Sequence, residues 1–163
     1  MNLGKLSIAL FVKNIDVSRS FYRDILKFEI ELDFGKNIIF RNGLAVWEIR
    51  ASHIIPMTLG ADKIRDTSVI RSELYFETET IDEDFRILKE NNVSFLHELH
   101  EESWGQRTIR FFDPDRHLIE IGESMTRFVS RYHKQGMTAD QISERTHVPV
   151  EEVIRLIAKN NSF

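Results

Sequence analysis

The chain of 163 residues has no cysteine and few prolines, and it has no apolar run long enough to span a membrane. Without cysteine it can form neither disulfides nor a thiol nucleophile. Its first residues lack the apolar core of a signal peptide. The net charge of −4 argues against a general nucleic-acid binder. We therefore expect a cytoplasmic protein with no membrane partner.

The clearest local pattern is a predicted β-hairpin at 109–121, with its turn at 113–115. Strand side chains alternate between faces, so Arg110 and Glu120 share one face and lie nearly opposite each other. The other face lies on the core, which leaves the face of Glu120 open to water, a cleft or a ligand. The apolar set of the hairpin is Ile109, Phe111, Ile119 and Ile121.

Three further segments show the same alternation of an apolar face with a second face. On three of the four strands the second face carries an acid, at Glu48, Glu73 and Glu120. Any one of these glutamates alone is typical of an ordinary solvated strand. The alternating sets are Leu6, Ile8, Leu10 and Val12 against Ser7, Ala9 and Phe11; Ala45, Trp47 and Ile49 against Val46, Glu48 and Arg50; Leu74 and Phe76 against Glu73, Tyr75 and Glu77.

The order of these segments is an internal repeat. Residues 7–32 indicate strand, helix, strand, and residues 73–99 indicate the same 66 positions later. The first helix is predicted to begin near Asp16 as its N-cap, and the second at 80–82. Each half then adds two strands, so each module is predicted to be βαβββ.

The two modules cover about 5–50 and 72–122, joined by a linker at 51–71 that is either a plain connection or a flap. They predict an α+β domain over 1–124 with a curved mixed sheet. Pairing of the modules would bring together the first and last strands of both. Four side chains would then face one another: Ser7, Glu48, Glu73 and Glu120.

At this point the chain resembles the vicinal oxygen chelate superfamily, which includes glyoxalase I, bleomycin-resistance proteins, fosfomycin-resistance enzymes and extradiol dioxygenases. The resemblance covers roughly residues 5–124, and the superfamily hosts many chemistries on one scaffold. The segments that carry it are 8–14 leading into 18–26, and Trp104-Gly-Gln-Arg107 leading into 112–115 and 118–121.

The resemblance implies metal ligands at Glu48, Glu73 and Glu120, with Ser7 in a fourth position where histidine or glutamine is usual. Glu73 also stands where histidine is common. Mg²⁺, Mn²⁺, Ni²⁺ and Zn²⁺ are the candidate ions, and three carboxylates without imidazole favour Mg²⁺ or Mn²⁺. The missing histidines argue against an Fe(II) dioxygenase.

Two interpretations of the acids remain open. Three converging carboxylates need either a metal or positive neighbours. Arg110 lies across the hairpin from Glu120, and Arg50 lies two residues from Glu48, so arginines can neutralise the acids in a metal-free binding site. The predicted substrate-binding residues are Arg50, Tyr75, Trp104, Arg107 and Arg110.

The tail at 125–163 predicts a helical extension. Its three helices are expected at 125–135, after Thr138 in a capping box with Gln141, and from Pro149. The last two resemble a helix-turn-helix in outline. Acids at the start of the last helix oppose DNA contact, so packing on the core or on a partner subunit is favoured.

Two functions follow from the resemblance. The first is a glyoxalase-like, metal-dependent lyase or isomerase acting on a small oxygen-bearing substrate, with Glu120 or Glu48 as general base. The second is a metal-free protein of the bleomycin-resistance type that binds a small molecule. The resemblance also implies a homodimer.

Overall fold

The computed structural model describes residues 7–66, 68 and 70–160. Leu6, expected in the first strand, lies outside the described residues. The chain divides into two compact units. Unit 1 holds residues up to Ser72 and the turn Phe112–His117, and unit 2 holds Glu73–Phe111 and the residues from Leu118 onward.

Unit 1 contains the first βαβββ module, in which the first and last strands are parallel neighbours. The sheet order is β1-β4-β3-β2, and α1 continues directly into a π-helix, η1. The linker contains a short helix, α2, and a 3-10 turn, η2. The elements are β1 Ile8–Phe11, α1 Ile15–Ser20, η1 Phe21–Ile25, β2 Ile30–Asp33, β3 Asn37–Phe40, β4 Leu44–Trp47, α2 Ile54–Leu59 and η2 Lys63–Arg65.

The first helix begins two residues earlier than the predicted cap allows. Asn14, with extended backbone, is the N-cap, and its side chain accepts hydrogen bonds from the backbone N–H groups of Asp16 and Val17 at 2.9 and 3.2 Å. The assignment of Asp16 as N-cap was therefore wrong. Since α3 begins at Ile81 and α1 at Ile15, the predicted spacing of 66 residues is kept.

The fourth strand differs from its predicted alternation. It ends at Trp47, before Glu48 and Arg50, and Val46 is fully buried although it was expected on the open face. Ile49 is buried as well. A continuous apolar run of this kind is typical of a strand covered on both faces, where alternation no longer reports exposure.

The turn 112–117 is anchored within unit 1 by its two acids. Asp113, 3% exposed, accepts hydrogen bonds from the Tyr22 hydroxyl at 2.9 Å and from the His117 backbone N–H at 2.8 Å. Asp115 accepts one from the Lys13 N–H at 3.0 Å. These buried carboxylates therefore have the partners that burial requires.

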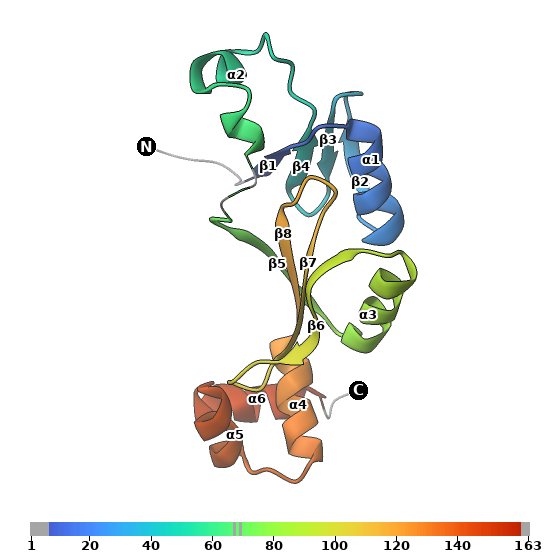
Figure 1. The fold of residues 1–163 in the computed structure, drawn as a ribbon. Helices are drawn as coiled ribbons and strands as arrows, with labels where there is room; N and C mark the ends of the chain where they lie inside the picture. The colour runs from blue at the N-terminus through green and yellow to red at the C-terminus, as the bar shows by residue number, and fades with distance from the viewer. Residues whose placement is uncertain (1–6, 67, 69, 161–163) are drawn as a thin grey trace. The chain divides into compact units, whose positions relative to one another are not determined.

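Unit 2 contains the second βαβββ module, so the predicted α+β class with two such modules is confirmed, as two four-stranded mixed sheets. The sheet order is β5-β8-β7-β6, with β5 and β8 parallel from Glu73 opposite Leu118 to Thr78 opposite Glu123. Helix α3 covers one face of the sheet (Figure 1). The elements are β5 Glu73–Thr78, α3 Ile81–Glu90, β6 Ser94–Glu101, β7 Arg107–Phe112 and β8 Leu118–Glu123.

The predicted helical extension is confirmed and also belongs to unit 2. It comprises α4 Met125–Lys134, α5 Ala139–Thr146 and α6 Val150–Asn160. The capping box of Thr138 with Gln141 is present. None of the described helices has the length and apolarity to cross a membrane. The three helices share a core of their own, formed by Phe128, Val129, Tyr132, Ile142, Val148, Val153 and Leu156.

Candidate functional site

The centre of the candidate site in unit 2 is Arg110 on β7. Its guanidinium donates to Glu73 Oε2 at 3.2 Å and to Glu102 Oε1 at 2.5 Å, and it forms an ion pair with Glu120. His97 Nε2 lies 3.1 Å from Nη1. The predicted pairing of Arg110 with Glu120 across the hairpin is confirmed. Arg110 thus gathers three carboxylates from β5, β8 and the loop after β6.

Glu120 is buried, at 4% exposure, although its face was expected to be open. Burial raises the pKa of this carboxyl, since it disfavours the charged form. The positive charge of Arg110 acts in the opposite direction, and the nearby Glu73 and Glu102 raise the pKa further. The net result is a pKa above the ordinary value. Glu120, whose side chain was expected to be exposed, is therefore a buried carboxyl group paired with Arg110.

Glu102 belongs to this cluster, although no pattern in the sequence indicates it. It follows the end of β6, and its side chain is only 15% exposed. The Thr108 hydroxyl donates to it at 3.0 Å. Burial opposes its ionisation, but the hydrogen bonds from Arg110 and Thr108 prevail and lower its pKa. Strand alternation gives no signal here because Glu102 lies in a loop.

A second group of side chains lies beside the cluster and contains both aromatic residues that were expected to bind substrate. Tyr75 is 46% exposed and Trp104 is 38% exposed. Gln106, which the sequence analysis did not select, joins them: it accepts from Trp104 Nε1 at 3.2 Å and its amide donates to the Tyr75 hydroxyl at 3.0 Å. We call Tyr75, Trp104 and Gln106 the aromatic ledge.

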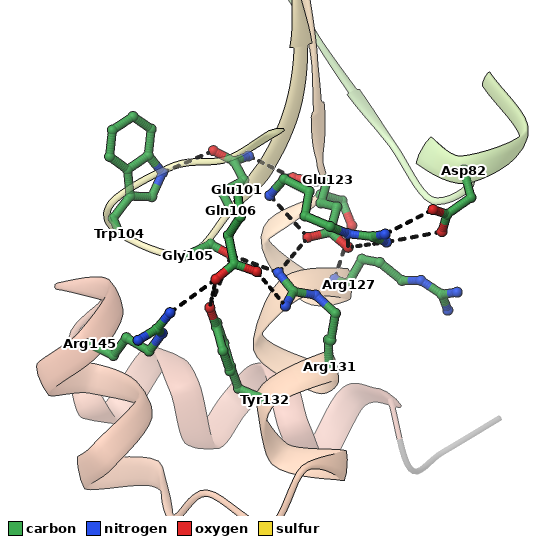
Figure 2. Close-up of polar contacts among 12 residues, drawn as sticks. Asp82, Glu101, Trp104, Gly105, Gln106, Glu123, Arg127, Arg131, Tyr132 and Arg145 are labelled. Atoms are coloured by element: carbon green, nitrogen blue, oxygen red, sulfur yellow. Dashed lines mark hydrogen bonds and ion pairs between the residues drawn. The ribbon is translucent and has the colours of Figure 1, made fainter. Parts of the chain in front are cut away.

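The ledge is packed over Gly122 of β8. A Cβ at this position would lie 2.9 Å from Gln106 Nε2 and 3.1 Å from Tyr75 Cε2, closer than ordinary contact. Gln106 Nε2 also donates to the backbone carbonyl of Glu123 at 2.7 Å, and this fixes its orientation (Figure 2). The missing side chain at 122 therefore makes room for the ledge.

Arg107, predicted to bind substrate, forms ion pairs with carboxylates of the protein itself. Its guanidinium contacts Glu123 at 2.8 and 2.9 Å and Asp82 at 2.9 and 3.1 Å (Figure 2). Burial disfavours charge on Glu123, but hydrogen bonds from Arg107 and Arg131 outweigh it and lower its pKa. The guanidinium of Arg107 is therefore held inside unit 2 as part of the structure.

The remaining predicted residues lie in unit 1. Glu48 accepts a hydrogen bond from the Ile15 N–H, at the start of α1, at 2.8 Å, and it pairs with Lys36 at 2.6 Å. Arg50 is exposed, and Ser7 is exposed and precedes β1. Helix N-termini stabilise carboxylates, so Glu48 has a structural role at α1.

The carboxylates of unit 2 do not fit a divalent ion as they are placed. An arginine keeps its charge at any pH that the fold tolerates, so a metal at Glu73 and Glu120 would have to displace a cation. In the part of the chain that the structure describes, no group of three or more His, Asp or Glu side chains is placed to hold a metal. The three-carboxylate set with Glu48 remains a prediction, as its members are divided between the units.

Comparisons with known proteins agree with this fold. The glyoxalase-like domain family matches residues 6–126. A protein of unknown function from Agrobacterium tumefaciens strain C58 is 35% identical, with a TM-score of 0.63, and the match covers 77% of this chain and 97% of that one. No curated protein matches the chain.

Two more distant structures share the fold. A lactoylglutathione lyase from Agrobacterium tumefaciens is 21% identical, with coverages of 76% of this chain and 96% of that one and a TM-score of 0.53. TioX from Micromonospora sp. ML1 is 14% identical, with coverages of 75% and 100% and a TM-score of 0.56.

The two βαβββ modules define a protein of the vicinal oxygen chelate superfamily. Within that class, the chain belongs to the glyoxalase-like domain family.

Proposed function

We propose that this protein binds a small aromatic cation without a metal, using the aromatic ledge and the carboxylates around Arg110. The observation that supports this most is the set of three carboxylates on one guanidinium. Three acids against one base leave surplus negative charge on this part of unit 2. This choice favours the second of the two functions that the sequence suggested over the metal-dependent lyase or isomerase.

The ledge supplies the aromatic part of the proposed recognition. Tyr75 and Trp104 keep more than a third of their surface free, and a cation over an aromatic ring gains electrostatic attraction in addition to buried area. Glu77 lies 3.4 Å from the Tyr75 hydroxyl and adds negative charge beside the ring. A planar ligand with positive charge suits both groups, whereas an anion would meet repulsion.

The first experiment measures binding of proflavine, a planar cationic dye, by fluorescence polarisation, with the anionic dye anilinonaphthalene sulfonate as comparator. We expect proflavine to bind more tightly, and Tyr75→Ala to weaken it about tenfold, in line with the loss of one stacking side chain. Ile154→Ala, which removes an apolar side chain of α6 that is somewhat more exposed than Tyr75, is the control. Tighter binding of the anion, or equal effects of the two variants, would overturn the proposal.

The second experiment tests the rival function. Protein purified in the presence of Mn²⁺ and Ni²⁺ is dialysed and its metal content is measured. We expect no stoichiometric metal in the unmodified protein. A stoichiometric ion that is lost in both Glu48→Ala and Glu120→Ala would instead establish the metal site of the lyase or isomerase.

A converse variant makes the role of Arg110 testable. Arg110→Ala removes the cation that the three carboxylates share, so this variant should acquire an affinity for Mn²⁺ that the unmodified protein lacks. Isothermal titration with MnCl₂ on both proteins measures the difference.

The homodimer implied by the resemblance stays a prediction, and sedimentation equilibrium tests it on the same samples.

A further inference from the structure

The loop between β6 and β7, residues 102–106, supplies two of the three ledge residues, Trp104 and Gln106. Two backbone hydrogen bonds close it: the Glu102 N–H donates to the Gln106 carbonyl, and the Gly105 N–H donates to the Glu102 carbonyl, both at 2.8 Å. These local bonds define the turn of the loop. Side-chain hydrogen bonds also join Glu102 and Gln106 to the sheet, and further contacts come from the helical extension.

Helix α4 holds the loop by one backbone carbonyl. The Gly105 carbonyl accepts a hydrogen bond from Arg131 Nη2 at 2.6 Å and lies 3.3 Å from the Tyr132 hydroxyl (Figure 2). Both donors are on α4, although they follow Gly105 by more than 25 positions. A helix outside the βαβββ module therefore adds a second anchor to the loop, beside the hydrogen bonds that join Glu102 and Gln106 to the sheet.

Glu101, the last residue of β6, receives three donors from the extension. They are the Tyr132 hydroxyl at 2.9 Å, Arg131 at 3.1 Å and Arg145 of α5 at 3.0 Å. Burial disfavours the charge of Glu101, but these bonds prevail and its pKa is lowered. The two guanidinium groups also lie 4.7 and 5.0 Å from the Tyr132 ring centre.

The sequence of the loop is adapted to this approach. Gly105 has φ +96°, and a Cβ there would lie 2.3 Å from the Tyr132 hydroxyl oxygen. Tyr132 is 4% exposed and also belongs to the core of the three helices. The same side chain thus packs the extension and contacts the loop, so a change in how the helices pack is transmitted to the loop.

We propose that Tyr132 is a positioning residue: through Gly105 and Glu101 it sets the loop that presents Trp104 and Gln106 to the ligand. The extension then tunes ligand affinity without touching the ligand. This inference rests on the proposed function for its affinity readout, but the position of Trp104 can be measured without any ligand.

The test uses full-length Trp47→Phe protein, in which Trp104 is the single tryptophan. Tyr132→Phe keeps the ring and removes the hydroxyl. We expect acrylamide to quench Trp104 more readily in this variant, and the proflavine affinity to fall by about three- to tenfold, the range of one lost hydrogen bond. Arg145→Gln, on an exposed part of α5, should show a smaller change of the same sign.

Tyr22→Phe is the matched control, since it also removes a buried hydroxyl bond, to Asp113, but in unit 1. It should lower stability without changing Trp104 quenching or dye affinity. If Tyr132→Phe and Tyr22→Phe give the same quenching and the same affinity, the positioning role is refuted even when proflavine binds. If proflavine does not bind the unmodified protein, the proposed function fails, and quenching alone still decides the role of Tyr132. If Tyr132→Phe does not fold, Arg145→Gln decides the positioning role instead, with Arg155→Gln as its control.

Discussion

Replacing Gly105 by alanine tests the contact between the loop and α4 directly. Two costs are expected. The first is backbone strain, since a residue with a Cβ at φ +96° loses about 1–2 kcal/mol. The second is the collision of the new methyl group with the Tyr132 ring and hydroxyl at 2.3–2.9 Å, which forces the ring to move.

The free-energy cost of the collision can be estimated from the interactions that Tyr132 would lose. Its hydroxyl has one proton, which the Glu101 carboxylate and the Gly105 carbonyl share, and this hydrogen bond contributes about 0.5–1.5 kcal/mol. Overpacking a buried site costs about 1–3 kcal/mol more. Displacing the ring relieves part of the overpacking, so the two losses overlap. We expect Gly105→Ala to lower the free energy of unfolding by about 3–5 kcal/mol in total.

Gly136→Ala isolates the strain. Gly136 lies in the same unit at φ +90°, and an added Cβ would have nothing within 4 Å. This variant should lose only the strain, about 1–2 kcal/mol. The gap between the two glycine variants, about 2–3 kcal/mol, measures the close approach of the loop to α4.

Urea unfolding followed by circular dichroism and by tryptophan fluorescence provides the assay, and agreement of the two probes shows whether one transition describes the chain. Tyr132→Phe combined with Gly105→Ala should cost less than the sum of the single variants, because both act on the same contact. Equal losses for Gly105→Ala and Gly136→Ala, or strict additivity with Tyr132→Phe, would refute the reasoning.

Three further predictions follow from the site. The pKa of Glu123 is lowered in the folded state, so its ionised carboxylate stabilises the fold above the ordinary value of 4.5, and this contribution is lost as the pH falls below that value. Glu123→Gln removes this pH dependence. The free energy of unfolding of this variant should therefore decline less steeply in acid, as measured by urea unfolding from pH 6 to pH 3. The pH dependence of Glu120 has the opposite sign, because its pKa is raised in the folded state. The protonated carboxyl stabilises the fold below 4.5, and this contribution is lost as the pH rises. The stability of Glu120→Gln should therefore increase relative to that of the unmodified protein as the pH goes from 4 to 7. Gly122→Ala should push Gln106 off Tyr75 and weaken proflavine binding several-fold with the thermal midpoint nearly unchanged, and an unchanged affinity would contradict the ledge.

The repeat and the hairpin could be predicted from the sequence because both are local patterns. The spacing of 66 residues between the two helices was predicted and is observed between Ile15 and Ile81, although the cap of the first helix was misplaced, and the alternation around 109–121 placed Arg110 nearly opposite Glu120. The capping box at Thr138 is likewise a short-range signal. In each case the side chains that carry the pattern are close in sequence or related by a regular period.

The partners of Arg110 beyond Glu120 could not be predicted in the same way. Glu102 reaches it from a loop, where no periodicity reports direction, and the burial of Glu120 depends on what covers its face. The error at Val46 has a similar origin, since alternation distinguishes two faces only when one of them is solvated. The sequence thus specified the hairpin and the order of the elements, but not which side chains are enclosed once the strands pair.

The contact between the loop and the helical extension is a feature of this chain that the family domain does not include. The glyoxalase-like match ends at residue 126, whereas the Gly105 carbonyl and Glu101 accept hydrogen bonds from Arg131, Tyr132 and Arg145 of the helical extension. The loop that carries Trp104 is therefore held both by the family domain and by residues that lie outside it. Function in such scaffolds depends on the site more than on the fold. The ligand of a relative therefore does not by itself identify the ligand of this protein. The Tyr132 variants measure how strongly the added helices affect the position of the loop and the affinity of the site.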